Sequence, residues 1–234
     1  MNFLEKLKCQ HRFLRYRYRT EKSTIARLLE HNLKGKTVID VGANKGVFSY
    51  WLHRAVGSNG RVIAFEPQPE LIPYLHSVKE AFGLTNWTII NKGLSDEETQ
   101  LKMYRPFAGS GGASVEDYNS DRGFETIHVA VTRLDDYLRE ENLKDIALMK
   151  VDVEGHELPV FKGAAEMLKE SKPILIFECH HDKAVDGELF GFLASLGYRG
   201  YFIHDNENIE YQKFQEYSYR KPGESHRNYF FVAA

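Results

Sequence analysis

The sequence lacks most of the features that mark a secreted, membrane-spanning or nucleic-acid-binding protein. Its 234 residues include only two cysteines, Cys9 and Cys179, whose wide separation matches no metal-ligand spacing and suits a reducing compartment. No stretch approaches the ~18 apolar residues of a membrane span, and the basic N-terminus is not followed by the apolar segment of a secretion signal. The net charge of -2 argues against nucleic-acid binding by bulk electrostatics. We therefore expect a one-domain cytoplasmic protein with no transmembrane segment and no nucleic-acid partner.

Residues 1–34 differ in charge from the rest of the chain, and we predict a basic helical extension there and a main domain over 35–234. The favoured interpretation is an amphipathic helix packed on the domain by its Phe, Leu and Tyr side chains. An anionic acceptor, a membrane surface or nucleic acid is the alternative partner of this segment. Its basic and interleaved apolar residues are Lys6, Lys8, Arg12, Phe13, Leu14, Arg15, Tyr16, Arg17, Tyr18, Arg19 and Lys22.

From Thr37 onward, β-branched runs alternate with stretches of helical periodicity. This alternation predicts a mostly parallel sheet with helices on both faces and right-handed crossovers. Residues 99–104 and 126–131 are predicted as an inserted strand pair, and the glycine-containing loop 109–114 between them is interpreted as a lid, an acceptor loop or a plain hairpin connection. The remaining predicted strands are 37–40, 61–66, 87–90, 146–151, 174–177, 198–203 and 228–232, and the predicted helices are 47–56, 71–82, 158–169 and 189–196.

The strongest local signal is the turn Asp40-Val41-Gly42-Ala43-Asn44-Lys45-Gly46 between the first strand and the first helix of this domain. Gly42 and Gly46 carry no Cβ, so the backbone can approach a ligand closely. The turn has neither the G-x-G-x-x-G of dinucleotide-binding folds nor the G-x-x-x-x-G-K-[ST] of a phosphate loop. A carboxylate at the strand end, Asp40, disfavours a phosphate and fits the ammonium and sulfonium groups of S-adenosylmethionine. The competing interpretation is an ordinary corner whose glycines serve packing.

Glu66 ends the second predicted strand, at the edge of the sheet where ligands bind in such folds. A carboxylate there accepts hydrogen bonds from both ribose hydroxyls of an adenosine cofactor, which requires an acceptor with two oxygens. NAD enzymes use the same device, so Glu66 indicates an adenosine ribose and not one particular cofactor. A capping or surface carboxylate is the alternative.

The segment Lys150-Val151-Asp152-Val153-Glu154-Gly155-His156-Glu157 places five ionisable residues directly after a buried strand. Such groups are costly to desolvate unless they are paired or used. We interpret Asp152 and Glu154 as functional and Glu157 as an acid that suits a helix N-terminus. His156 is a candidate general base, since histidine titrates near neutral pH.

A third polar segment, Glu178-Cys179-His180-His181-Asp182, follows the fifth predicted strand. With Asp152 on the neighbouring strand, Glu178 and His180 offer oxygen and nitrogen ligands for Mg²⁺ or Mn²⁺. The spacing matches no closed metal motif, so simple loop polarity is the favoured interpretation.

Taken in order, these motifs resemble the FkbM family of S-adenosylmethionine-dependent methyltransferases, from about Thr37 to the C-terminus. The resemblance rests on several separate segments, while the basic N-terminal segment lies outside it. The segments are Asp40 to Gly46, Phe65-Glu66-Pro67-Gln68-Pro69, Thr132-Arg133-Leu134-Asp135, Lys150 to Glu157, Phe161-Lys162-Gly163-Ala164, Pro173 to Glu178 and Leu196-Gly197-Tyr198.

The resemblance implies a Rossmann-like class I methyltransferase fold, with a seven-stranded sheet whose last strand, 228–232, is antiparallel. It also implies O-methyl transfer, often to sugar hydroxyls of glycans or glycosylated small molecules. His156 and the His180-His181 pair depart from what we expect of the family. The cofactor positions implied by the resemblance are Asp40, Gly42, Asn44, Gly46, Glu66, Pro67, Gly93, Leu94, Ser95 and Asp152.

The predicted reaction is an in-line displacement in which a base assists an acceptor hydroxyl. We assign His156 as the base, Glu154 as its rival, and Asp152 as the group that orients the acceptor or holds a metal. An NAD-linked oxidoreductase, a non-catalytic adenosyl-binding module and an RNA methyltransferase are the alternatives. The sequence leaves open the identity of the acceptor, the need for a metal and the choice between a monomer and a homo-oligomer.

Overall fold

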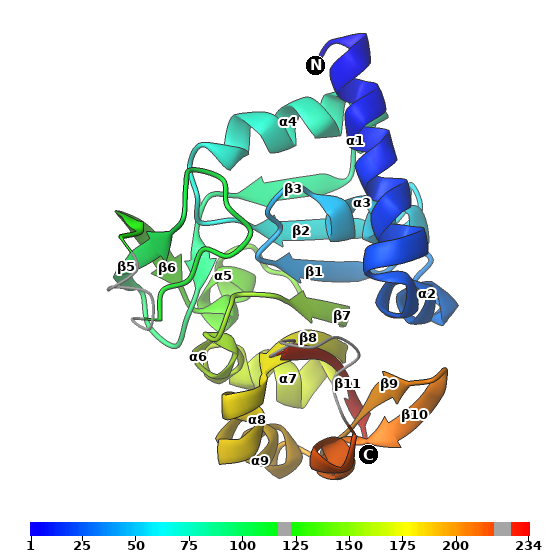
Figure 1. The fold of residues 1–234 in the computed structure, drawn as a ribbon, viewed down its shortest axis with the longest axis vertical. Helices are drawn as coiled ribbons and strands as arrows, with labels where there is room; N and C mark the ends of the chain where they lie inside the picture. The colour runs from blue at the N-terminus through cyan, green and yellow to red at the C-terminus, as the bar shows by residue number, and fades with distance from the viewer. Residues whose placement is uncertain (117–122, 218–225) are drawn as a thin grey trace.

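The computed structural model describes residues 1–116, 123–217 and 226–234. Its centre is an eight-stranded sheet with the strand order β10-β9-β11-β8-β7-β1-β2-β3 (Figure 1). The inner strands run parallel, and β11 runs antiparallel to both β8 and β9. The strands of this sheet are β1 (Thr37–Val41), β2 (Arg61–Phe65), β3 (Trp87–Ile90), β7 (Ile146–Val151), β8 (Ile174–His180), β9 (Tyr198–His204), β10 (Glu207–Glu210) and β11 (His226–Ala233).

Helices cover both faces of the sheet because successive strand residues point to opposite sides. Val38 and Leu148 pack with the first group of helices, α1 to α4, whereas Ile39 and Met149 pack with the second group, α5 to α9. This confirms the predicted α/β class. The helices are α1 (Phe3–Arg15), the π-helical turn η1 (Tyr16–Thr20), α2 (Lys22–Glu30), α3 (Val47–Val56), α4 (Leu71–Phe82), α5 (Leu134–Glu140), α6 (Glu157–Lys162), α7 (Ala165–Ser171), α8 (His181–Asp186), α9 (Glu188–Ser195) and the 3-10 turn η3 (Tyr211–Glu216).

The predicted number of seven strands is wrong by one. The extra strand, β10, pairs antiparallel with β9 at the sheet edge. Asp205 and Asn206 connect the two strands, and both have positive φ angles, 46° and 69°. Two adjacent residues of positive φ suit a tight hairpin turn, for which glycine is the usual sequence signal.

The predicted single helix over 158–169 is two helices, α6 and α7. The carboxylate of Asp135 causes the break, because its two oxygens accept hydrogen bonds from the backbone N–H groups of Glu166 and Met167, each at 3.0 Å. Asp135 thus caps the start of α7 from a different part of the chain, as a local cap residue would.

The predicted inserted strand pair is present and belongs to a separate three-stranded sheet. Its strands, β4 (Gly93–Leu94), β6 (Glu125–Thr132) and β5 (Thr99–Arg105), pair in that order, β6 running parallel to β4 and antiparallel to β5. Figure 1 shows β5 and β6 beyond the ends of β1 and β2 at which the strand arrows point. The small sheet therefore overhangs the carboxyl ends of the parallel strands.

The basic N-terminal segment folds as α1, η1 and α2. Phe13 of α1 is buried and stacks on Tyr50 of α3, with ring centroids 4.3 Å apart. The predicted packing through Phe, Leu and Tyr side chains is only partly right, because Leu14 and Tyr18 are exposed. Among the described residues, no helix combines the length and apolar character needed to cross a membrane.

Candidate active site

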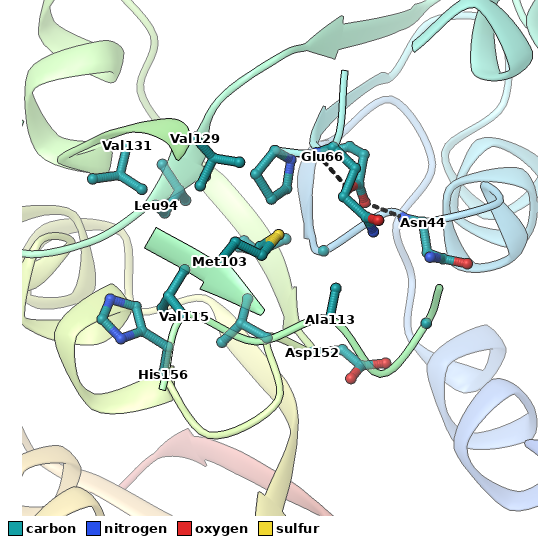
Figure 2. Close-up of a pocket in the computed structure, with 17 residues that line it drawn as sticks. Asn44, Glu66, Leu94, Met103, Ala113, Val115, Val129, Val131, Asp152 and His156 are labelled. Carbon is teal, nitrogen blue, oxygen red and sulfur yellow. Dashed lines mark hydrogen bonds between the residues drawn. The ribbon is translucent and has the colours of Figure 1, made fainter. Parts of the chain in front are cut away.

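A pocket lies between the carboxyl ends of β1, β2 and β7 and the overhanging small sheet. Figure 2 shows two unlike ends: Leu94 and Val131 lie at one, and Asn44 and Asp152 at the other. The pocket therefore combines an apolar slot with a polar end. Its lining is Val41, Gly42, Asn44, Glu66, Pro67, Gln68, Gly93, Leu94, Met103, Gly111, Ala113, Val115, Val129, Val131, Asp152, Val153 and His156.

Glu66 is the buried carboxylate of this pocket. One of its oxygens accepts a hydrogen bond from the backbone N–H of Asn44 at 2.6 Å, and the other from that of Gln68 at 2.9 Å. Burial raises the pKa of Glu66 to about 7, although both of these hydrogen bonds lower it. A carboxylate has about four acceptor positions, so Glu66 can still accept hydrogen bonds from two ligand hydroxyls.

The two glycines of the first turn serve different purposes. Gly42 lines the pocket with a φ angle of 77°, and a Cβ there would lie 1.9 Å from the carbonyl oxygen of Asp152. Gly46 lies outside the pocket lining, and its Cβ would meet the Trp87 ring at 2.8 Å. The packing interpretation thus accounts for Gly46, whereas Gly42 brings two backbone segments together at the pocket floor.

Asp40 does not line the pocket, although the sequence predicted it as a cofactor residue. It is fully buried, and one carboxylate oxygen accepts a hydrogen bond from the hydroxyl of Ser49 on α3. Burial raises the pKa of Asp40, and the charge of Lys150 opposes that rise. Asp40 therefore lies behind the pocket, where it shares the buried charge of Lys150.

Lys150 is a buried cation near the carboxyl end of β7. Its ammonium donates to Asp152 at 2.7 Å and lies 4.3 Å from the centre of the Phe48 ring. Burial lowers the pKa of Lys150, but the charges of Asp152, Asp40 and Glu178 outweigh burial and raise it. From its sequence position Lys150 was predicted only as one more ionisable residue, and this pairing role was not predicted.

His156 lies at the apolar end of the pocket, near Leu94 and Val131 (Figure 2). Its Nε2 is 3.0 Å from the hydroxyl oxygen of Ser95, and its Nδ1 is 2.9 Å from a carboxylate oxygen of Glu116. The hydrogen bond with His156 lowers the pKa of Glu116. Both ring nitrogens are thus held by side chains, and Ser95 stands behind His156 and not in the pocket lining.

Glu154 and His180 form a pair at the carboxyl ends of β7 and β8. Glu154 adopts a positive φ of 54°, and its side-chain oxygen lies 3.4 Å from Nε2 of His180. This hydrogen bond raises the pKa of His180, whereas burial alone lowers it. Next to the pair, His226 lies 2.9 Å from Glu178, and burial raises the pKa of Glu178.

The predicted metal ligands are not arranged as a metal site. Asp152 pairs with Lys150, His180 with Glu154, and Glu178 with His226. Within the described ranges, no three His, Cys, Asp or Glu side chains are grouped to hold a metal ion. The donor set present does not fit Mg²⁺ or Mn²⁺, and we derive no chemistry from a metal.

A second, polar cavity of about 190 Å³ lies at the carboxyl end of β9 and the first half of β11, beside η1 and the start of α2. Asn228 donates a hydrogen bond to Glu21 across it at 3.1 Å. Burial, followed by the charge of Glu178, raises the pKa of Glu21 to about 7, and the charge of Asp152 adds to this rise. The charges of Glu178 and Asp152 therefore reach Glu21 in this cavity. Its lining is Arg19, Thr20, Glu21, Ser23, Thr24, Ile203, His204, His226, Arg227, Asn228 and Phe230.

The glycine-containing loop after β5 covers the first pocket. Gln68 holds it from both sides, since its amide nitrogen donates to the Ser110 carbonyl at 3.0 Å and its amide oxygen accepts from the Gly109 N–H at 3.1 Å. Further along, the Ser114 hydroxyl donates to the Glu154 carbonyl at 2.7 Å. These contacts place the loop as a cover and not as a bare hairpin connection. Gln68 was recognised only as part of the Phe65 to Pro69 motif, and its role in holding the loop depends on a contact about forty residues away in the chain that the motif does not reveal.

Residues 40–200 match the model of the Methyltransferase FkbM domain. The chain belongs to the FkbM methyltransferase family. This membership confirms the resemblance of the sequence motifs and removes the NAD-linked oxidoreductase interpretation. The first pocket lies within the matched residues, whereas the residues that line the second cavity lie outside them.

Two curated relatives and one solved structure are similar to the chain. Methyltransferase 1 of Beauveria bassiana is 28% identical over 143 residues, which cover 54% of this chain and 57% of that protein. The hexuronic acid methyltransferase AglP of Haloferax volcanii is 31% identical over 166 residues, covering 69% of this chain and 63% of that protein. The crystal structure of Methyltransferase FkbM from Methylobacillus flagellatus has a TM-score of 0.59 at 19% identity and covers 85% of this chain and 44% of that one. The chain thus spans about half to two thirds of these proteins, and the structural likeness establishes the fold.

Proposed function

We propose that the protein is an S-adenosylmethionine-dependent O-methyltransferase that methylates a hydroxyl of a sugar or of a glycosylated small molecule. The observation that supports this best is one pocket in which the Glu66 carboxylate stands beside an apolar slot of Leu94, Val129 and Val131. A carboxylate pairs with ribose hydroxyls, and an apolar slot accepts an adenine ring.

The residues of the first pocket fit the adenosyl cofactor. Glu66 takes the ribose, the slot with Gly93 and Leu94 takes the adenine, and Gly42, Asn44 and Asp152 surround the methionine portion. When bound, S-adenosylmethionine supplies the sulfonium methyl group that an acceptor hydroxyl displaces in line. The loop held by Gln68 excludes water from this pocket.

The polar cavity lined by Glu21, His226 and Asn228 is the proposed acceptor site. Its lining is almost entirely hydroxyl, amide, imidazole and charged groups, which suits a ligand rich in hydroxyls. The Haloferax relative is named for a hexuronic acid, which offers only oxygen atoms for methylation. Both observations support a carbohydrate acceptor and transfer to oxygen.

The proposed base differs from the one that the sequence suggested. His156 lies at the adenine end, with both ring nitrogens engaged, so we assign it to holding Ser95 and the cofactor slot. The His180 ring lies with its centroid 5.8 Å from that of His226, which lines the acceptor cavity. We assign His180, raised in pKa by Glu154, to accepting the proton of the acceptor hydroxyl.

Calorimetric titration with S-adenosylmethionine, S-adenosylhomocysteine and NAD⁺ in parallel tests the cofactor. We expect micromolar binding, about -8 kcal/mol, for the two adenosyl ligands alone. Absence of adenosyl binding would reject the proposal. An acceptor screen with uronic acids and neutral sugars follows, and alkali treatment of the product separates a stable methyl ether from a labile methyl ester.

Two matched histidine variants test the assignment of the base. For His180→Ala we expect turnover to fall ~10²-fold or more, with S-adenosylhomocysteine affinity unchanged. For His156→Ala we expect weaker S-adenosylhomocysteine binding with turnover retained at saturating donor. The opposite pattern would restore His156 as the base. Turnover at the wild-type rate in both variants would rule out both histidines as the base.

A further inference from the structure

The outer face of α1 exposes a line of large apolar side chains. Within the described residues, six of the eight exposed large hydrophobics lie between Met1 and Tyr18, and the other two are Phe107 and Val185. We name five of them the apolar stripe: Phe3 (74% exposed), Leu4 (67%), Leu7 (45%), Leu14 (42%) and Tyr18 (63%). Solvent exposure of so many large apolar groups in one place marks an interaction surface.

The apolar stripe lies opposite the packed side of α1 and continues into η1. Leu4, Leu7 and Leu14 of α1 lie along one line of the helix, with the exposed His11 between them, while Phe3 lies beside this line and Tyr18 belongs to the following π-helical turn η1. Cys9 and Phe13 lie on the other side and are buried against α3 and α4. A reciprocal capping box between Asn2 and Glu5 fixes the first turn. Figure 1 shows the N-terminal turns of α1 extending past α4.

The flanks of the apolar stripe are strongly basic. Residues 1–22 contain seven lysines and arginines and two glutamates, a formal charge of +5, whereas the whole chain has -2, so the remainder has -7. Lys8, Arg15 and Arg17 occupy the positions next to the stripe on its two sides, and Lys8 and Arg15 are exposed. The occupant of this face must therefore accept apolar side chains and positive charge together.

An anionic lipid surface meets both requirements. A second copy of α1 would bring Lys8, Arg15 and Arg17 against the same residues of its partner, with no acid at the facing positions to offset the repulsion. Nucleic acid accepts the cations but offers no apolar phase for the leucines. We propose that α1 docks the protein on an anionic lipid surface, with the apolar stripe among the acyl chains and the flanking cations at the headgroups. This inference does not depend on the proposed function.

Flotation of the full chain with vesicles tests the proposal. The probes are phosphatidylcholine vesicles and vesicles in which part of the phosphatidylcholine is replaced by phosphatidylglycerol. We expect binding to the second kind only, weakened by salt, because screening reduces the attraction of the cations. Equal binding to both kinds, or binding to neither, would overturn the proposal.

Matched variants separate the two contributions. In Leu4→Gln/Leu7→Gln the affinity should fall about tenfold per leucine, since each loses the burial of its apolar side chain. In Lys8→Glu/Arg15→Glu it should also fall at least about tenfold. The controls Val185→Gln, 52% exposed on α8, and Lys102→Glu, exposed on β5, should bind as wild type.

The substituted side chains are exposed, so S-adenosylhomocysteine binding and the melting temperature should be unchanged and serve as folding controls. Two results refute a lipid surface. One is wild-type flotation of Leu4→Gln/Leu7→Gln. The other is a dimer of the wild-type chain, measured by light scattering, that this variant converts to a monomer.

Discussion

Replacing Glu66 by glutamine tests the cofactor assignment with almost no change in shape. The two carboxylate oxygens now accept from the backbone N–H groups of Asn44 and Gln68, at 2.6 and 2.9 Å. A glutamine has one acceptor oxygen, and its NH₂ group must face one of these N–H groups or a ribose hydroxyl. Glu66→Gln therefore removes half of the acceptor capacity of the site without opening a cavity.

The magnitude follows from the bonds that are lost. A hydrogen bond to a charged group contributes ~1.5–3 kcal/mol, so the loss of one ribose contact should weaken S-adenosylhomocysteine binding ~10- to 150-fold. The pH dependence of S-adenosylhomocysteine binding provides a second, independent test. Ribose hydroxyls donate to the ionised carboxylate, and the pKa of Glu66 is about 7 in the folded protein. Binding to the wild type should therefore weaken as the pH falls below 7, while binding to Glu66→Gln should not change.

Isothermal titration with S-adenosylhomocysteine measures both effects, and Glu98→Gln is the matched control. Glu98 is a surface acid that pairs with Lys92, and its side chain is 64% exposed. We expect Glu98→Gln to bind as wild type throughout the pH range. If Glu66→Gln binds S-adenosylhomocysteine as tightly as wild type, Glu66 does not hold the ribose and the orientation proposed for the cofactor is wrong.

Three further variants address the charges behind the pocket. Lys150→Met leaves Asp40 and Asp152 without their buried cation and should lower the free energy of unfolding by ~3–5 kcal/mol in urea denaturation. Glu157→Gln should gain up to ~3 kcal/mol of stability over wild type between about pH 5 and pH 8, because burial raises the pKa of Glu157 from 4.5 to about 7 and the folded protein loses stability as this group ionises. Glu154→Gln should shift the acidic limb of the pH–turnover profile to lower pH, because Glu154 raises the pKa of His180, which must be neutral to accept a proton. An acidic limb that does not shift would rule out His180 as the base.

The sequence predicted the central sheet well because buried parallel strands are apolar on both faces. A short apolar run such as 61–66 is therefore recognisable as a strand of this kind. The sequence missed β10 because 207–210 is polar and the connecting turn has no glycine. The break between α6 and α7 depends on Asp135, which lies about thirty residues earlier in the chain. The contact with Asp135 leaves no pattern in either segment, so the local signal at this break is limited to Gly163, which ends α6.

The position of a residue at a strand end predicted which acids lie at the ligand edge but not which way their side chains point. Side-chain alternation along the strands would have supplied this, since residues two apart share a face. Val38 and Leu148 belong to the core under α1 to α4, so Asp40 and Lys150, two residues on, face the same layer, where Ser49 and Phe48 of α3 meet them. Asp152 is the next residue on that face, beyond the end of the strand, and it pairs with Lys150 while lining the pocket. Asp40 and Asp152 thus point to the same face, but Asp40 is buried under the helices α1 to α4, whereas Asp152 lies past the end of β7 and lines the pocket.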